Sequence, residues 1–155
     1  MIELNVKTVV SLTHMIGSDM VKSGKGKMLH VSSTAGFSPG PLQAVYFATK
    51  AFVTSFSQAI DQELRTKGVT STALCPGGVA TEFFERANLQ DTRLGQGKGA
   101  FASAESCAKF GYDAMTQGKL VAVNKRSFSF MVNWITPLLP RRLVLKMIAS
   151  MQSIP

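Results

Sequence analysis

Two side chains in the first third of the sequence have the types and spacing of a proton-transfer pair. Tyr46 and Lys50 are four residues apart, so on a helix their side chains share one face. A tyrosine, with a pKa of about 10, is a weak acid-base catalyst at neutral pH. A neighbouring ammonium group favours the phenolate and lowers that pKa toward a useful range. The pair by itself also fits a half-buried tyrosine beside a solvated lysine.

A serine is predicted to reach the same place from a strand. The run 27–33 has the short apolar pattern of a strand in a parallel sheet, and Ser33 ends it, where ligands of open α/β sheets bind. A hydroxyl there can donate to a carbonyl oxygen while Tyr46 delivers the proton. The rival role, a hydrolytic nucleophile, needs a base beside Ser33. The only histidines are His14 and His30, and we expect packing roles for both.

Four elements in one order give the sequence a family resemblance. Asn5, Ser33, the run Tyr46-Phe47-Ala48-Thr49-Lys50 and the run Pro76-Gly77-Gly78-Val79-Ala80-Thr81 together resemble the catalytic half of a short-chain dehydrogenase/reductase. The resemblance extends to about Val123. Epimerases and dehydratases also use a Tyr-x-x-x-Lys pair, but the second run fits the short dehydrogenases better. The segment 138–143 is similar, more weakly, to reductases of 3-ketoacyl and steroid carbonyls.

The resemblance implies a role for each of these residues. Tyr46 would be the general acid in reduction and the base in oxidation, while Lys50 would lower its pKa and hydrogen-bond the nicotinamide ribose. Ser33 would polarise the carbonyl of the substrate. Asn5 would hold a water molecule that connects Lys50 to solvent. The implied activity is hydride transfer between NAD or NADP and a small carbonyl or alcohol substrate, which could be lipophilic.

The resemblance also implies contacts to the cofactor and the substrate. These residues follow the predicted second strand or lie just beyond it. The contacts to the nicotinamide and its phosphate would come from Pro76, Gly77, Val79 and Thr81, in addition to Tyr46 and Lys50. The side chains of Phe83 and Phe84 could form a wall of the substrate pocket, although they also fit a hydrophobic core.

One part of the family pattern is absent from this sequence. The family begins with a strand, a Thr-Gly-x-x-x-Gly-x-Gly turn and a helix whose N-terminus binds the pyrophosphate. The cluster Gly95-Gln96-Gly97-Lys98-Gly99 follows a polar segment, and we interpret it as a flexible loop over the substrate. We therefore expect a truncated chain, weak cofactor binding and an unpaired sheet edge at the strand near Val31. Met1 would be an internal methionine or the start of a truncated gene.

The hydrophobic pattern predicts the elements that position these residues. A mostly buried helix over 3–22, a long helix over 42–67 and a helix over 103–116 alternate with strands over 27–33, 69–75 and 119–123. This order favours a partial Rossmann-like, doubly wound parallel sheet in three α/β/α layers. We expect one domain over 1–155, in which 1–123 is the catalytic half and 124–155 an apolar and basic helical tail.

Composition limits the remaining possibilities. The formal net charge is +8, and after Asp113 there are six basic residues and no acidic one. No nucleic-acid-binding pattern and no metal-type cysteine spacing occur, and the start has no signal-peptide pattern. We expect a cytoplasmic homodimer or higher oligomer that packs through the helices around Val9 and Phe56. The alternatives are an inactive fragment that serves as an interaction module, and a membrane-peripheral protein that uses the basic tail.

Overall fold

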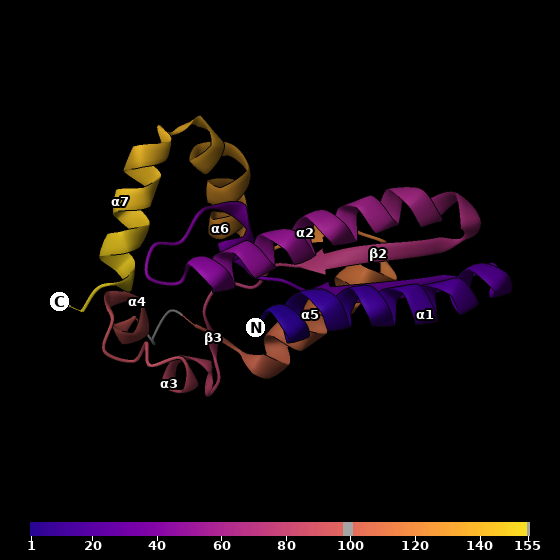
Figure 1. The fold of residues 1–155 in the computed structure, drawn as a ribbon, viewed down its shortest axis with the longest axis horizontal. Helices are drawn as coiled ribbons and strands as arrows, with labels where there is room; N and C mark the ends of the chain where they lie inside the picture. Colours follow the sequence, from indigo (N-terminus) through magenta and orange to yellow (C-terminus); the bar gives the residue numbers. More distant parts are fainter. Residues whose placement is uncertain (98–100, 155) are drawn as a thin grey trace.

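A three-stranded parallel sheet forms the centre of the computed structural model, which describes residues 1–97 and 101–154 (Figure 1). The strands β1 (Gly26–Val31), β2 (Val69–Leu74) and β5 (Val121–Ala122) lie in the order β1-β2-β5. The predicted parallel α/β sheet is confirmed. A second sheet was not predicted: β3 (Val79–Ala80) pairs in parallel with β4 (Ala102–Ser103). Strands of two residues are too short to leave a periodic pattern in a sequence.

Helices cover both faces of the main sheet, which gives the predicted three layers. The π-helical turn η1 (Glu3–Lys7) continues into α1 (Thr8–Ser23), which lies on the same face of the sheet as α2 (Ala44–Leu64). On the other face, α5 (Ala104–Thr116) packs against apolar side chains of β1, β2 and β5. The strands alternate accordingly, because successive side chains of a strand point to opposite faces.

Left-handed glycines end the first two long helices where the sequence predicts their ends. Gly24 follows α1 with φ of 68°, and Gly68 follows the 3-10 turn η3 (Arg65–Lys67) with φ of 78°. Residues with a Cβ rarely adopt this conformation, which is common at the ends of helices. The helix α5 begins differently, because the hydroxyl of its N-cap Ser103 accepts the backbone N–H of Ser106.

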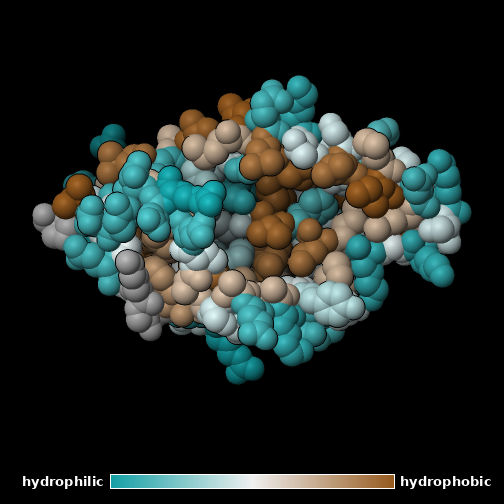
Figure 2. All heavy atoms as spheres, turned by 90° about the horizontal axis from the view of Figure 1, so that it is seen from below, coloured by the Kyte–Doolittle hydropathy of each residue, from teal (hydrophilic) through white to brown (hydrophobic). Residues whose placement is uncertain are grey.

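The prediction of a mostly buried first helix is wrong. In α1 only Thr13 and Gly17 are buried, while the large side chains of Leu12, Met15 and Ile16 are exposed. The neighbouring strand β1 lies at an edge of its sheet, as predicted. The helix is apolar as predicted, but in the described residues no other element covers its outer face. Figure 2 shows apolar side chains gathered in the middle of one broad face of the molecule.

The tail contains two helical segments and a sharp break. The first comprises α6 (Arg126–Phe130), η5 (Met131–Ile135) and η6 (Thr136–Leu138), and after Pro140 the chain continues as α7 (Arg141–Gln152). Figure 1 shows them side by side at one end of the molecule. Val144 and Ile148 of α7 pack against Phe47, so this helix caps the beginning of α2. Among the residues that the structure describes, no helix is both long and apolar enough to cross a membrane.

Candidate active site

Asn5 is brought to the Tyr46–Lys50 helix by the turn that precedes α1. Its amide Nδ2 donates to Thr49 Oγ1 over 3.1 Å, and that hydroxyl donates in turn to the carbonyl oxygen of Tyr46 over 2.9 Å. Asn5 lies in the π-helical turn η1, a distortion that often occurs at functional sites. Asn5 therefore lies beside the predicted acid-base pair, next to the residue that precedes Lys50.

Ser33 lies at the carboxyl end of β1, where it begins the 3-10 turn η2 (Thr34–Phe37). Its Oγ accepts the backbone N–H of Ala35 over 3.1 Å, and the adjacent backbone N–H of Thr34 donates to the carbonyl oxygen of Pro76 over 2.9 Å. The serine turn and the Pro76 turn are thus bonded to each other. This places the residues from two separate strand ends at one edge of the sheet, as the sequence predicts.

Burial controls the acid-base properties of the pair. It raises the pKa of the Tyr46 phenol above its ordinary value, and hydrogen bonding by the Ser33 hydroxyl acts in the opposite direction. It also lowers the pKa of Lys50, which the charge of a Cys75 thiolate would raise. We expected Lys50 to lower the pKa of Tyr46, and in this structure the net direction is upward. Lys50 Nζ lies 5.8 Å from the centre of the Tyr46 ring and donates to the Val31 carbonyl oxygen over 3.0 Å.

The turn that follows β2 is held from both sides. The backbone N–H of Gly77 donates to Asn124 Oδ1 over 3.0 Å, and the carbonyl oxygen of Gly78 accepts the N–H of Ala102 over 3.1 Å. A Cβ on Gly77 would lie 2.7 Å from the ring of Phe128, so a larger residue there would have to displace that ring. The expected cofactor contacts Val79 and Thr81 follow the turn: Val79 is half-buried and Thr81 is exposed.

The two phenylalanines after this turn differ in their surroundings. The ring of Phe83 is 40% exposed and its centre lies 5.5 Å from that of Tyr46. Phe84 is buried and stacks on Phe101 with 4.6 Å between ring centres. Phe83 is thus placed to contact a molecule bound at Tyr46, whereas Phe84 belongs to the core beneath it.

Two surface cavities, each of about 560 Å³, lie beside the candidate site and not on it. Neither is lined by Ser33, Tyr46 or Lys50. One adjoins Thr81 and Phe84, and the other lies between the loop 36–41, α2 and the start of α7.

In the glycine cluster predicted as a loop, Gly95 and Gln96 belong to the short helix α4 (Arg93–Gln96), which follows α3 (Phe83–Arg86). Lys98 and Gly99 lie outside the described residues.

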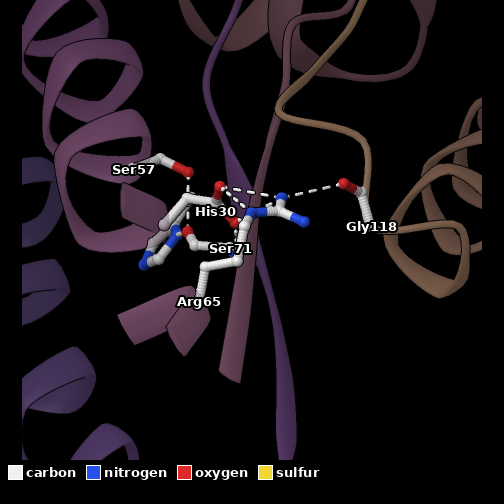
Figure 3. Close-up of polar contacts among 6 residues, drawn as sticks. His30, Ser57, Arg65, Ser71 and Gly118 are labelled. Carbon is white, nitrogen blue, oxygen red and sulfur yellow. Dashed lines mark hydrogen bonds and ion pairs between the residues drawn. The ribbon is translucent and has the colours of Figure 1, made fainter. Parts of the chain in front are cut away.

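The buried histidine takes part in a hydrogen-bond network on the opposite side of β1 from α5. His30 Nε2 bonds the hydroxyl of Thr13 over 2.8 Å. On the other side of the ring, Nδ1 bonds the hydroxyl of Ser71 over 2.9 Å, and Ser71 also bonds Ser57 (Figure 3). Asp61 accepts the backbone N–H of Ser71. Both ring nitrogens of His30 therefore have hydrogen-bond partners other than Ser33. The packing role expected for His14 is wrong, because its side chain is exposed. The hydrolytic role for Ser33 thus lacks its base.

Sequence reasoning missed two residues that support the site. Thr49 links Asn5 to the backbone of Tyr46, and Asn124 holds the Gly77 turn. Thr49 could have been found from its position three residues after Tyr46, because such residues are neighbours on a helix. Asn124 carries no local signal, since its role depends on where β5 ends in space.

Comparison with known proteins gives consistent matches. The model of the family "short chain dehydrogenase" matches residues 1–92. A very-long-chain 3-oxoacyl-CoA reductase of Macaca fascicularis is 31% identical over 97% of this chain and 45% of its own length. The chain thus spans less than half the length of this relative.

Solved structures show the same fold. A short-chain dehydrogenase from Sphingobium yanoikuyae in complex with NADPH superposes with a TM-score of 0.74 and 25% identity, over 83% of this chain and 49% of that one. A 7beta-hydroxysteroid dehydrogenase superposes with a TM-score of 0.80 over 97% of this chain and 57% of that one. With 23% identity, the latter likeness concerns the fold alone.

Proposed function

Because the chain belongs to the short-chain dehydrogenase family, we propose that it supplies the catalytic half of an NAD(P)-dependent oxidoreductase acting on a carbonyl or alcohol. The observation that carries this proposal is the convergence of Asn5, Ser33, Tyr46 and Lys50 from three elements at one sheet edge. These are the residues that the family resemblance predicts. The activity of the whole protein follows from this half only in combination with a site for the rest of the cofactor.

In the proposed reaction the Tyr46 phenol donates its proton to the oxygen of the carbonyl being reduced. Ser33 donates a hydrogen bond to the same oxygen, where negative charge develops. Lys50, freed from the Val31 carbonyl, would hold the cofactor ribose and favour the phenolate after proton transfer. Asn5 would hold the water molecule through which Lys50 exchanges protons with solvent.

The residues present fit one end of a nicotinamide dinucleotide. The half-buried backbone at Val79 and the exposed Thr81 lie on the turn bonded to the Ser33 loop, which suits the nicotinamide and its phosphate. The described residues contain no glycine-rich turn between a strand and a helix for the pyrophosphate. When bound, the cofactor supplies or accepts the hydride. We expect the chain alone to bind NADPH or NADH weakly or not at all, and saturable micromolar binding in calorimetry would contradict this.

We further propose a lipophilic carbonyl substrate. The support is the half-exposed ring of Phe83 over Tyr46, and the 3-oxoacyl-CoA named for the Macaca relative. An apolar ring beside the reacting group favours an acyl or ring carbonyl over a highly polar substrate. We also propose that two copies of the chain associate as a homodimer through the outer faces of α1 and α2.

The test is a fusion of a family nucleotide-binding half to the N-terminus of this chain. We expect it to oxidise NADPH in the presence of a 3-oxoacyl-CoA. Tyr46→Phe should lower kcat about 10²- to 10⁴-fold, because the proton donor is lost. Tyr112→Phe, which changes an exposed tyrosine of α5, is the matched control and should retain activity. Equal rates for Tyr46→Phe and the parent fusion would show that Tyr46 is not the acid.

The alternative is an inactive interaction module. It is favoured if the fusion binds NADPH and the chain is folded by circular dichroism, yet no carbonyl substrate is reduced. The arrangement of Ser33, Tyr46 and Lys50 would then be inherited from an active ancestor without serving catalysis in this chain.

A further inference from the structure

The tail exposes an apolar stripe on its first helical segment. The side chains of Phe130, Trp134 and Leu138 are spaced four residues apart along α6, η5 and η6, and all three are exposed. Their exposed fractions are 60%, 67% and 84%. Met131 and Ile135 widen the stripe. Single exposed apolar residues are ordinary on protein surfaces, but a contiguous stripe marks a contact surface.

The second tail helix repeats this pattern. On α7 the inward side chains Val144 and Ile148 pack against Phe47. The outward positions Leu143, Met147 and Met151, again four residues apart, are also apolar and exposed. A helix on the surface of a water-soluble protein places polar residues on its outer face. This helix has one apolar side in the core and a second one facing outward.

The charges of the tail have one sign. After Asp113 the sequence contains six basic residues and no acidic one. Arg141, Arg142 and Lys146 are exposed on α7, and Arg126 is exposed at the start of α6. Across residues 1–97 and 101–154, none of these four forms an ion pair with a carboxylate. The apolar stripes are therefore bordered by cations whose charge is not neutralised within the described chain.

We propose that the tail surface, formed by these two stripes and their bordering cations, binds an anionic lipid bilayer at its interface. The apolar side chains would enter the acyl boundary, and the arginines would extend their charged ends to lipid phosphates. Tryptophan is favoured at the same depth, because its ring is apolar and its N–H is polar. A second copy that presents the same tail surface fits less well, because the tail after Asp113 contains basic residues and no acidic one, so two such surfaces would bring like charges together.

This placement brings the candidate active site near the lipid. The helix α7 packs on Phe47, which precedes the site helix residues Thr49 and Lys50, and Tyr46 borders the same cluster. A bilayer on the outer side of α7 would thus lie one helix away from Tyr46. The inference does not depend on the proposed reductase activity, since it uses only the tail residues.

The single tryptophan of the chain makes the test direct. Trp134 is the only tryptophan, so its fluorescence reports on the tail surface alone. The intact chain is titrated with vesicles of phosphatidylcholine, with or without 30 mol% phosphatidylserine. Each titration is carried out at low and at high salt. We expect a blue shift of emission and co-sedimentation with the anionic vesicles, quenching by lipids brominated near the headgroup, and weaker binding at high salt.

Paired variants separate the apolar and the charged contributions. Trp134→Ser/Leu138→Ser should lower the partition coefficient about tenfold or more, whereas Tyr112→Ser/Leu120→Ser, at exposed apolar positions outside the tail, should not. Arg141→Gln/Arg142→Gln should lower it roughly fivefold for each cation. Lys25→Gln/Lys67→Gln removes the same charge from two exposed positions outside the tail and is the control. Circular dichroism checks that each variant is folded.

Three results would overturn the proposal. The first is an unchanged Trp134 emission with anionic vesicles, and the second is equal binding by the tail variants and their controls. The third is a blue shift that grows with protein concentration without lipid, which would assign the tail surface to a second copy. Fusion-enzyme activity plays no part in these readouts, so failure here leaves the proposed reaction standing.

Discussion

The pKa of Tyr46 depends on its burial and on the neighbouring hydroxyl of Ser33. Burial disfavours the charged phenolate and raises the pKa, and the Ser33 hydroxyl opposes this by stabilising the same charge. The lysine four residues away is bonded to a strand carbonyl. In this structure the Ser33 hydroxyl is therefore the group that opposes the rise in the pKa of Tyr46.

The titration of Tyr46 can be measured without any activity, because the chain has only two tyrosines. In a Tyr112→Phe background, ultraviolet absorbance should show phenolate formation at a pH above the ordinary tyrosine pKa of 10.0. Ser33→Ala should move the titration to still higher pH, since the opposing hydrogen bond is lost. Circular dichroism at each pH confirms that the fold persists. A midpoint that falls after Ser33→Ala would refute this account of the pair.

His30 makes stability depend on pH. Burial lowers its pKa in the folded chain below the ordinary value of 6.5. The unfolded chain therefore binds a proton at a higher pH than the folded one, and the free energy of unfolding falls as the pH drops below about 6.5. Above that pH both states are neutral and the histidine contributes no pH dependence. Urea unfolding at pH 7.5 and 5.5 should show this loss.

The matched variant for this prediction is His30→Gln, which keeps a hydrogen-bonding side chain between Thr13 and Ser71 but does not titrate. It should be less stable at pH 7.5, and its stability should change less between the two pH values. His14→Gln, at an exposed position of α1, is the control and should leave the dependence unchanged. An identical pH dependence in His30→Gln and the parent chain would contradict the assignment.

At the scale of elements, the two helix-to-strand turns interlock. Gly24 ends α1 and Gly68 precedes β2, and a Cβ on Gly68 would lie 2.0 Å from the carbonyl oxygen of Gly24. The carbonyl oxygen of Gly68 in turn accepts the N–H of Gly26, over 3.1 Å. The starts of β1 and β2 are thus aligned by these turns, which fixes the register Gly26↔Val69.

A pair of alanine substitutions separates backbone strain from steric contact. Gly24→Ala meets no atom within 4 Å and should cost only the left-handed conformation, about 1 kcal/mol. Gly68→Ala adds the clash and should cost at least about 2 kcal/mol more, because the neighbouring backbone must move. Chemical denaturation measures both. Equal costs for the two variants would show that the turns do not interlock.

At the scale of the whole molecule, an edge strand and the outer face of a helix remain uncovered by the described residues. Val31 on β1 is 58% exposed, and Leu12, Met15 and Ile16 line the neighbouring α1. Unpaired strand edges and apolar helix faces both favour association with other chains. The free face of α1 lies on a different element from the tail surface, so the two surfaces can act independently.

We expect the chain to form a homodimer through this face of α1 and the adjoining face of α2. Met15→Glu/Ile16→Glu should shift sedimentation equilibrium toward the monomer, because two carboxylates would be buried in the contact. Met147→Glu, an exposed methionine of the tail, is the control and should leave the dimer intact. A chain that is monomeric at all concentrations would exclude this face as the contact.

Much of this protein can be predicted from the sequence. The helix and strand order and the glycine stops at Gly24 and Gly68 depend on local pattern, which a sequence displays directly. The site residues Asn5, Ser33, Tyr46 and Lys50 stay a prediction from motif and resemblance, and the structure brings them to one edge of the sheet. The exposure of α1 could not be predicted, since an apolar face looks the same whether or not another element covers it. The two-residue strands β3 and β4 were missed because they exist only through their pairing.

The sequence by itself determined the chemistry that these residues can perform, because residue type and helical or strand spacing set which groups share a face. Only the tertiary structure decided the direction of the pKa shifts and the contacts that hold the turns of the site. Burial sets the direction of the Tyr46 pKa, Asn124 reaches the Gly77 turn from the end of β5, and packing against Phe47 decides which side of α7 is buried. Each depends on distances between residues far apart in the chain, which spacing along the sequence does not specify.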